Sequence, residues 1–471
     1  MLIEACPAKP LDVFRKICAQ PFSFFLDSCG INRYSLLGAN PLILIKAQNN
    51  KVEVTGCGEA KITTDDVFTT VNSIFNKFKK AKRRLSFPFP FQGGGMAGYF
   101  GYDLKNQLED LSKKRAVLPV IPDCILGVYD TIFVYDCKIN KGYCVSAGLT
   151  SDGREEKLLA KERINRLLDI ISTDDSQRIL PSQTITYKDN IESNFTKTGY
   201  IDAIRIIQGY IASGDIYQAN LSQRFIVNYK GNPAALYNAL RKISPAPFGA
   251  FLNYGDFQII SNSPERLLKI KDNIAETSPI KGTRPRGKNI TEDKYLIRDL
   301  RNSKKEKAEH IMIVDLERND LGRFCEYGSV KVKSLKKLYA YPTLHHMVST
   351  VTGKVKNGMG PVDCLRLFFP GGSVTGAPKI RAMEIIEEME PTSRGIYTGA
   401  IGWIDFRGNM DMSMAIRTAV LKNGHLYLNV GGGIVADSKP EEEYQETILK
   451  AKAFFKAIGI EEQGLGIRKL V

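Results

Sequence analysis

Short apolar runs bounded by turn residues dominate the first part of the chain. Residues 41–45 (PLILI) and 128–134 (VYDTIFV) are two such runs, and each predicts a strand. Apolar positions then favour a helix over about 155–171. The polar, aperiodic residues 172–177 (STDDSQ) are typical of a linker. The pattern therefore predicts two regions, an N-terminal one of residues 1–185 and a second one of residues 186–471.

Helical periodicity is clearer in the second region. Isoleucines recur every three or four positions over 201–211, and Gly214 is placed to end that helix. Residues 291–320 predict one or two helices. The last helix has an apolar stripe over 444–458, and Ser438 with Glu441 forms a possible capping box before it. Alone, this periodicity indicates only a mixed α and β protein.

Composition restricts the class of protein. The 471 residues are 43% hydrophobic, and no apolar run is long enough to cross a membrane. The N-terminus lacks the layout of a secretory signal, and the nine cysteines are scattered without a C-x-x-C pair. We therefore expect reduced thiols in a cytoplasmic protein.

The net charge of +15 allows several kinds of partner. Nucleic acid, a membrane surface and a small anionic substrate are all compatible with a basic chain. The basic clusters at 79–84, 113–115 and 304–305 lie far apart, and no nucleic-acid motif accompanies them. Solvated lysine-rich faces, with no nucleic-acid or membrane partner, are the simpler interpretation. A non-catalytic nucleic-acid-binding protein remains the alternative from another class.

Two pairs of carboxylates have metal-binding potential. Glu306 and Glu309, and likewise Glu443 and Glu446, are three residues apart in predicted helices, so each pair shares one helical face. Oxygen ligands suit Mg²⁺, and no histidine or cysteine has the spacing that zinc needs. A solvated helix face is the ordinary interpretation of either pair taken alone.

Lys281 lies in a short glycine-bearing segment, Pro-Ile-Lys-Gly-Thr. A lysine amine could act there as a nucleophile, although an exposed turn is the commoner role. With the ordinary pKa of about 10.4, only about one amine in 2,500 is neutral at pH 7. A reactive Lys281 therefore needs desolvation or a partner base, and Glu265 is the candidate.

Glycine-rich segments offer backbone amides to an anion. Residues 369–379 (FPGGSVTGAPK) form a glycine-rich turn leading into a helix, and residues 431–433 are three glycines that could form a second nest. Arg417 could clamp a carboxylate, and Lys450 lies one helical turn beyond Glu446. A third segment, 93–98, matches G-x-G-x-x-G, but a strand-like stretch follows it where a dinucleotide site needs a helix.

Several of these segments resemble the chorismate-utilising enzymes. The resemblance is carried by residues 261–266 (SNSPER), 279–287 (PIKGTRPRG), 309–320 (EHIMIVDLERND), 344–349 (LHHMVS) and 443–447 (EYQET). It is nearly continuous from residue 214 to the last helix and looser before residue 190. The implied fold is an α/β (α+β) two-layer sandwich of large antiparallel sheets with outer helices.

The resemblance also implies a reaction. The lysine at position 281 resembles that of the aminodeoxychorismate synthases, which have a lysine at the corresponding position, whereas the anthranilate synthases have alanine there. The expected activity converts chorismate and ammonia to 4-amino-4-deoxychorismate, for 4-aminobenzoate and folate synthesis, through a covalent lysine adduct. An anthranilate synthase component I is the alternative, and isochorismate or salicylate synthases fit less well. The chain has no G-x-C-x-G-x-Q turn, so a separate glutamine amidotransferase is expected to supply ammonia.

Roles for individual residues follow from the same resemblance. Glu265 is implied as general acid and base, and His346 as a catalytic group near the departing ring substituent. Mg²⁺ is implied at Glu306, Glu309, Glu443 and Glu446. The residues implied to line the chorismate pocket are Thr283, Thr375, Gly376, Tyr397, Arg417, Gly432, Gly433 and Lys450. Residues 33–38 (RYSLLG) correspond to a region where relatives hold tryptophan.

Overall fold

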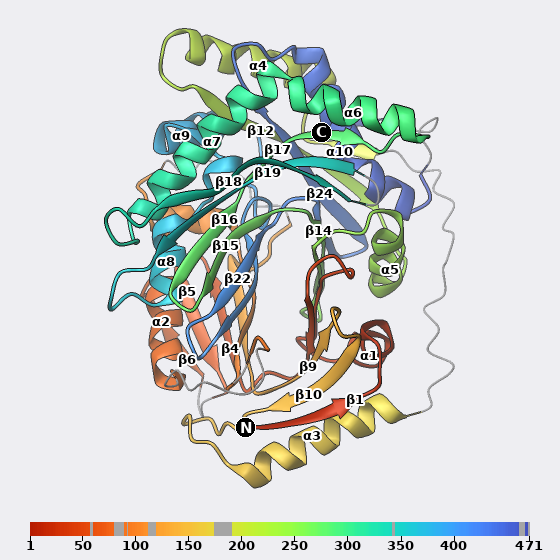
Figure 1. Ribbon diagram of the computed structural model, residues 1–471, viewed down its shortest axis with the longest axis vertical. Helices are drawn as coiled ribbons and strands as arrows, with labels where there is room; N and C mark the ends of the chain where they lie inside the picture. Colours follow the sequence, from red (N-terminus) through yellow and green to blue (C-terminus); the bar gives the residue numbers. More distant parts are fainter. Residues whose placement is uncertain are drawn as a thin grey trace.

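Two large sheets form the centre of the protein, and helices cover them (Figure 1). The computed structural model describes residues 1–56, 60–79, 89–91, 93–111, 119–173, 191–341 and 344–460, and the backbone of 467–469. Nearly all neighbouring strands in both sheets run antiparallel, the exception being the pairing of two short segments near residues 191 and 467. The α/β sandwich implied by the resemblance is confirmed.

The first sheet has 13 strands and contains the long strand that carries the three glycines. In spatial order its strands are β1 (Leu2–Cys6), β10 (Lys141–Ser146), β9 (Thr131–Asp136), β3 (Tyr34–Gly38), β2 (Phe24–Asp27), β13 (Phe248–Asn253), β14 (Phe257–Ser263), β23 (Thr418–Lys422), β24 (His425–Ile434), β12 (Gln218–Asn228), β11 (Ile191–Ser193) and β25 (Ile467–Lys469), with β20 (Gly376–Ala377) also paired to β12.

The second sheet has 12 strands and contains the segment with Lys281. In spatial order its strands are β17 (Ile280–Pro285), β19 (Leu344–Lys354), β16 (Ile274–Ser278), β15 (Arg266–Lys271), β22 (Met410–Met414), β21 (Ala400–Asp405), β7 (Gly95–Phe100), β8 (Cys124–Tyr129), β4 (Ile43–Gln48), β5 (Lys51–Thr55) and β6 (Lys61–Thr63), with β18 (Lys331–Ala340) also paired to β19. Both sheets take strands from both predicted regions. The boundary at residue 185 lies outside the described residues, and the two-region division stays a prediction.

Helices pack on the outer side of each sheet. They are α1 (Pro10–Ile17), α2 (Val67–Phe78), α3 (Lys157–Ser172), α4 (Lys197–Ala212), α5 (Pro233–Ile243), α6 (Ile290–Asn302), α7 (Lys304–Gly322), α8 (Pro361–Phe368), α9 (Lys379–Met389) and α10 (Pro440–Ala457), with 3₁₀ turns η1 (Tyr102–Gln107) and η2 (Gly372–Val374). In the described part of the chain, no helix combines the length and hydrophobicity of a membrane span.

The hydrophobic core is layered in the same way as the secondary structure. Side chains of both sheets meet in one cluster, in which the rings of Phe24 and Tyr129 lie 4.7 Å apart. Further clusters fill the spaces between the second sheet and α2, α7 and α8, and between the first sheet and α1, α3, α5 and α10. Strands β8 and β12 are buried on both faces, because each lies between two layers, whereas β6 and β18 are mostly exposed.

The predicted helices are confirmed with small shifts. The pattern over 155–171 corresponds to α3, and the isoleucines of 201–211 lie on α4, which Gly214 follows with a φ of +82°. The pattern over 291–320 forms two helices, α6 and α7, because Ser303 lies between them and caps α7. Of the predicted linker 172–177, residues 174–177 lie outside the described residues.

Three local predictions need correction. The run 128–134 is not one strand, since β8 ends at Tyr129 and β9 begins after Asp130. The capping box at the last helix is wrong, because α10 begins after Lys439 with no side-chain cap, and the Ser438 hydroxyl donates instead to Glu443. The three glycines 431–433 form no nest, since they pair in β24 with β12. Most of the G-x-G-x-x-G segment lies in β7, between β21 and β8. Of the strand-like stretch that follows it, residues 99 and 100 are in β7, whereas η1 begins at Tyr102.

Candidate active site

Lys281 extends from β17 of the second sheet toward β24 of the first. The pairing of β17 with β19 shifts register between Ile280 and Thr283, and Gly282 has a φ of +82°. A bulge of this kind re-aims a side chain. The Lys281 amine consequently lies beside Gly433, where a Cβ atom would be 3.0 Å from Nζ. The site therefore lies where the two sheets approach each other.

Glu265 lies where the chain passes from the first sheet to the second, between β14 and β15. Its side chain is 6% exposed and accepts a hydrogen bond of 2.9 Å from the Ser373 hydroxyl. Burial raises the pKa of Glu265 to about 7, although Ser373 and the ammonium groups of Lys281 and Lys450 act in the opposite direction. At neutral pH this carboxyl group can therefore both donate and accept a proton.

Gln218 is a further residue of the site, and no role was predicted for it from the sequence. It begins β12, is fully buried, and lies against the same point of Gly433 as the Lys281 amine. Neither atom of its amide group has a hydrogen-bond partner within the described structure. An unsatisfied buried polar group costs about 1–3 kcal/mol. The Gln218 amide is thus available to a polar ligand held between the sheets.

His346 and Thr283 form one wall. The Thr283 hydroxyl and His346 Nδ1 are 2.9 Å apart, on the paired strands β17 and β19. Burial, together with the positive charge of Arg417, lowers the pKa of His346 to about 3, so this imidazole is neutral at pH 7. Burial lowers the pKa of Arg417, and the Glu265 charge acts in the opposite direction. Arg417 therefore places a cation near two of the three predicted catalytic side chains, His346 and Glu265.

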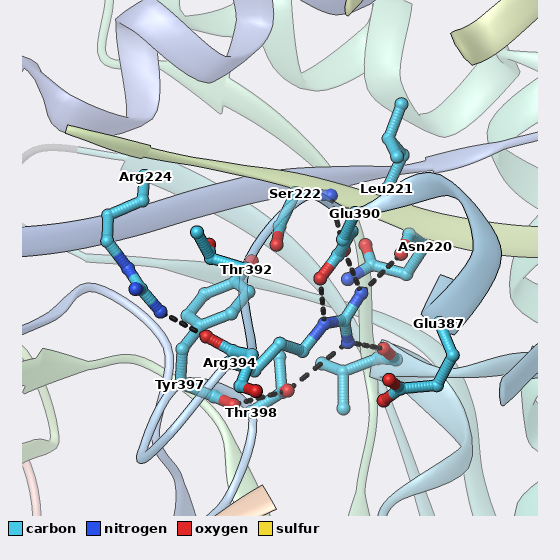
Figure 2. Close-up of polar contacts among 12 residues, drawn as sticks. Asn220, Leu221, Ser222, Arg224, Glu387, Glu390, Thr392, Arg394, Tyr397 and Thr398 are labelled. Carbon is cyan, nitrogen blue, oxygen red and sulfur yellow. Dashed lines mark hydrogen bonds and ion pairs between the residues drawn. The ribbon is translucent and has the colours of Figure 1, made fainter. Parts of the chain in front are cut away.

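A buried arginine, Arg394, holds a second wall in place (Figure 2). Its guanidinium group pairs with Glu390 at 2.6 Å and donates to the carbonyl oxygens of Val374 and Asn220. These contacts join α9, β12 and the segment that carries Tyr397, whose pKa is raised to about 12 by burial.

The predicted residues Thr375 and Gly376 lie in the turn that Arg394 fixes. The Thr375 hydroxyl donates to the carbonyl oxygen of Gly371 at 3.1 Å, so it is engaged within its own turn. Gly376 packs so tightly that a Cβ atom would lie 2.1 Å from the carbonyl oxygen of Gln218. Glycine is therefore required here for close approach of two backbones, beside the orphaned amide.

The four predicted metal ligands come from α7 and α10. Glu306 lies beside Gly282, which follows Lys281 in the chain. Glu443 lies beside Gly432, which precedes Gly433. The oxygen donors fit the chemistry of Mg²⁺. In the described residues, however, no three acidic, histidine or cysteine side chains are arranged as a metal cluster.

Each of these four carboxylates forms an ion pair with a basic side chain. Arg284 lies 3.2 Å from Glu306, and Lys305 lies between Glu309 and Glu443. The remaining pair, Lys450 and Glu446, has an N–O distance of 2.7 Å. Lys450 also donates to the carbonyl oxygen of Gly431 at 2.7 Å, which fixes its ammonium group beside β24.

A separate cavity of about 570 Å³ lies between the sheets. Arg33, Tyr34, Phe248 and Trp403 contribute to its lining, and none of the predicted catalytic, substrate or metal residues does. The cavity thus includes part of the segment 33–38 and is distinct from the space around Lys281.

An amine, a buried carboxyl group and several cations between two sheets are typical of an enzyme that acts on a small anion. Residues 22–456 match the family model described as chorismate binding enzyme. The chain is 38% identical over 97% of its length to anthranilate synthase component 1 of Pseudomonas aeruginosa, of which it covers 94%. It is 36% identical over 97% of its length to aminodeoxychorismate synthase component 1 of Bacillus subtilis, of which it covers 96%.

A solved structure agrees with these relatives. Anthranilate synthase component I from Streptococcus pneumoniae superposes with a TM-score of 0.79 and 33% identity, covering 90% of this chain and 92% of its own. The chain therefore belongs to the chorismate binding enzyme family. The relatives include proteins named for two different products, so membership alone does not identify the product.

Proposed function

We propose that this protein converts chorismate and ammonia into 4-amino-4-deoxychorismate. The observation that supports this most directly is the position of the Lys281 amine, which lies beside Gly433, as does the Gln218 amide, and in the field of the buried Glu265. The side chain of a lysine in an ordinary surface turn would extend into solvent, whereas that of Lys281 extends toward β24 of the other sheet. No disulfide joins the eight cysteines that the structure describes, which suits a reducing compartment, and we place the reaction in the cytoplasm.

The proposed reaction has two displacement steps. First, the neutral Lys281 amine forms a bond to C2 of chorismate, both ring double bonds shift by one position, and the C4 hydroxyl leaves as water with a proton from Glu265. The proton lost by the lysine nitrogen returns to the carboxylate. Ammonia then attacks C4, both double bonds shift back, and the bond between C2 and the lysine nitrogen breaks as that nitrogen takes up the proton of Glu265. The proton that the new ammonium group loses restores the acid form of Glu265. The net change is chorismate plus ammonia to the 4-amino product plus water.

Other side chains bind and orient the substrate in this proposal. Arg417 and Lys450 supply positive charge for its carboxylates, and the neutral His346 lies near the departing hydroxyl. Glu306, Glu309, Glu443 and Glu446 would hold Mg²⁺, which when bound supplies positive charge for the ring carboxylate. Thr283, Thr375, Gly376, Tyr397 and Gly432 complete the proposed pocket.

Ammonia is proposed to come from a separate glutamine amidotransferase. The names of the two curated relatives, which call each protein component 1, support a partner subunit. The isolated chain should therefore use ammonium salts but not glutamine. Glutaminase activity of the purified chain alone would contradict this proposal.

The product is the first measurable prediction. Incubation with chorismate, Mg²⁺ and ammonium should give 4-amino-4-deoxychorismate, separated by chromatography and identified by mass and by its enzymatic conversion to 4-aminobenzoate. A fluorescent 2-aminobenzoate product would instead identify an anthranilate synthase. A shift of DNA mobility without chorismate turnover would favour the non-catalytic alternative.

Anthranilate synthase component I is the second candidate. The chain is 38% identical to the Pseudomonas aeruginosa anthranilate synthase component 1 and 36% identical to the Bacillus subtilis aminodeoxychorismate synthase component 1, each over nearly the whole of both chains. Overall identity therefore supports the two candidates about equally. The two candidates share the scaffold and differ in the carbon that receives nitrogen. Lys281 supports the 4-amino product, because direct amination at C2 needs no nucleophilic side chain.

The neighbouring glycines of β24 provide a matched pair of variants. A Cβ atom at Gly433 would lie 3.0 Å from both the Lys281 amine and the Gln218 amide, whereas one at Gly432 would lie 3.3 Å from Glu443 and 3.8 Å from Lys450. We expect Gly433→Ala to lower kcat/KM by about 100-fold, because small misplacements of reacting groups have large effects. Gly432→Ala should lower it less. Equal effects in steady-state kinetics would contradict the placement of Lys281.

A further inference from the structure

One lysine bridges the two helices that carry the predicted metal ligands. Lys305 lies in the first turn of α7, and its ammonium nitrogen is 4.0 Å from Glu309 on the same helix. The same nitrogen is 3.5 Å from Glu443 on α10. Lys305 therefore joins one carboxylate of each predicted pair, as a divalent cation between the helices would.

The carboxylates repel one another without such a charge. Glu309 on α7 and Glu443 on α10 both lie within 4.0 Å of the Lys305 ammonium nitrogen. A positive charge at this position offsets the repulsion between the two carboxylates.

Lys305 is held less firmly than Lys450 and Arg284, the other two cations that pair with the four carboxylates. Lys450 has a 2.7 Å contact to Glu446 and a second one to the Gly431 carbonyl oxygen. Arg284 pairs with Glu306 at 3.2 Å and with Asp299 at 2.6 Å. The two contacts of Lys305 are longer, and its side chain is 46% exposed. A long flexible stem at the surface can move into solvent with little change elsewhere.

We propose that Lys305 is a built-in counterion that occupies the cation position between Glu309 and Glu443, and that a divalent cation binds there by displacing its ammonium group. The inference rests on the metal site of the proposed function. Lys305 is a positioning residue, which keeps the carboxylates together before the metal enters. Because the metal must compete with Lys305, the wild type should bind the metal more weakly than the same carboxylates would without this lysine.

Binding of Mn²⁺ without chorismate tests this proposal. Free Mn²⁺ is measured by electron paramagnetic resonance during titration of the wild type, Lys305→Met and Lys304→Met. Lys304 is the adjacent exposed residue, and its replacement removes the same charge from the same helix turn. We expect Lys305→Met to lower the Kd for Mn²⁺ about fivefold, the size of one exposed ion-pair contribution. Lys304→Met should leave it nearly unchanged.

Three outcomes of this titration would bear on the role of Lys305. Unchanged or weaker binding by Lys305→Met overturns the proposal, and so does the absence of saturable binding in all three proteins. Glu309→Gln should weaken binding in the Lys305→Met background, which shows that the tighter site is the predicted one. Chorismate turnover with ammonium is measured separately. A protein that turns over chorismate but shows no competition by Lys305 refutes this inference alone.

Discussion

Replacing Lys281 with alanine is expected to lower formation of the 4-amino product by about 10³-fold or more. The variant keeps Glu265, Arg417 and the carboxylates but has no group to bond to C2. The amine lies beside Gly433, where the two sheets approach each other. The measurement is chromatography of the products at saturating chorismate and ammonium.

Intact mass spectrometry tests the covalent step itself. After chorismate is added without ammonia, the wild type should gain the mass of chorismate less one water, and Lys281→Ala should gain none. Borohydride should not be needed to hold the adduct, because it is a secondary amine rather than a Schiff base. Lys288→Ala, an exposed lysine beyond the same strand, serves as the control. Product formation by Lys281→Ala at the wild-type rate would show that the covalent route is wrong.

The sequence predicted much of this site because its residues lie in dense local motifs. Lys281, Glu265 and His346 each belong to a distinctive segment, whereas Arg417 was predicted from its chemistry alone. In the structure Lys281 acts electrostatically on Glu265, Arg417 on His346, and Glu265 on Arg417. Gln218 ends residues 214–218 (GDIYQ), where the resemblance to the family begins, but that segment does not indicate a role for its amide. The unpaired amide becomes evident only in the structure, where it lies beside Gly433 as the Lys281 amine does.

Helical spacing predicted the carboxylate pairs but not their environment. The spacing places Glu306 and Glu309 on one face of α7, yet it cannot indicate which cation lies across the gap to α10. The proposed nest at residues 431–433 failed for a related reason. Glycines are consistent with either a turn or an extended strand, and the ladder between β24 and β12 decides for the strand.

Glu265→Gln is expected to reduce kcat by about 10²- to 10⁴-fold, the usual contribution of a general acid. Glutamine keeps the size of the side chain and can still accept the hydrogen bond from Ser373, so the loss should come from chemistry rather than folding. In the wild type, kcat/KM should fall as the pH rises through about 7, because the protonated carboxyl group is the form that assists the departing hydroxyl. This basic limb should be absent in the variant.

Stability gives an independent measurement with a defined sign. The native state binds the Glu265 proton more tightly than the unfolded chain, whose glutamate has a pKa near 4.5. Glu265 should therefore contribute about 3 kcal/mol of stability that is lost as the pH rises from about 4.5 to about 7. Glu265→Gln should remove this contribution, while that of other buried carboxyl groups with a raised pKa, such as Glu317, remains. Glu317→Gln is the matched control, since burial also raises the pKa of Glu317, to about 8, and its carboxylate accepts a hydrogen bond from Thr277. If the basic limb of kcat/KM disappears in Glu317→Gln and persists in Glu265→Gln, then Glu317 rather than Glu265 controls the protonation that the reaction requires.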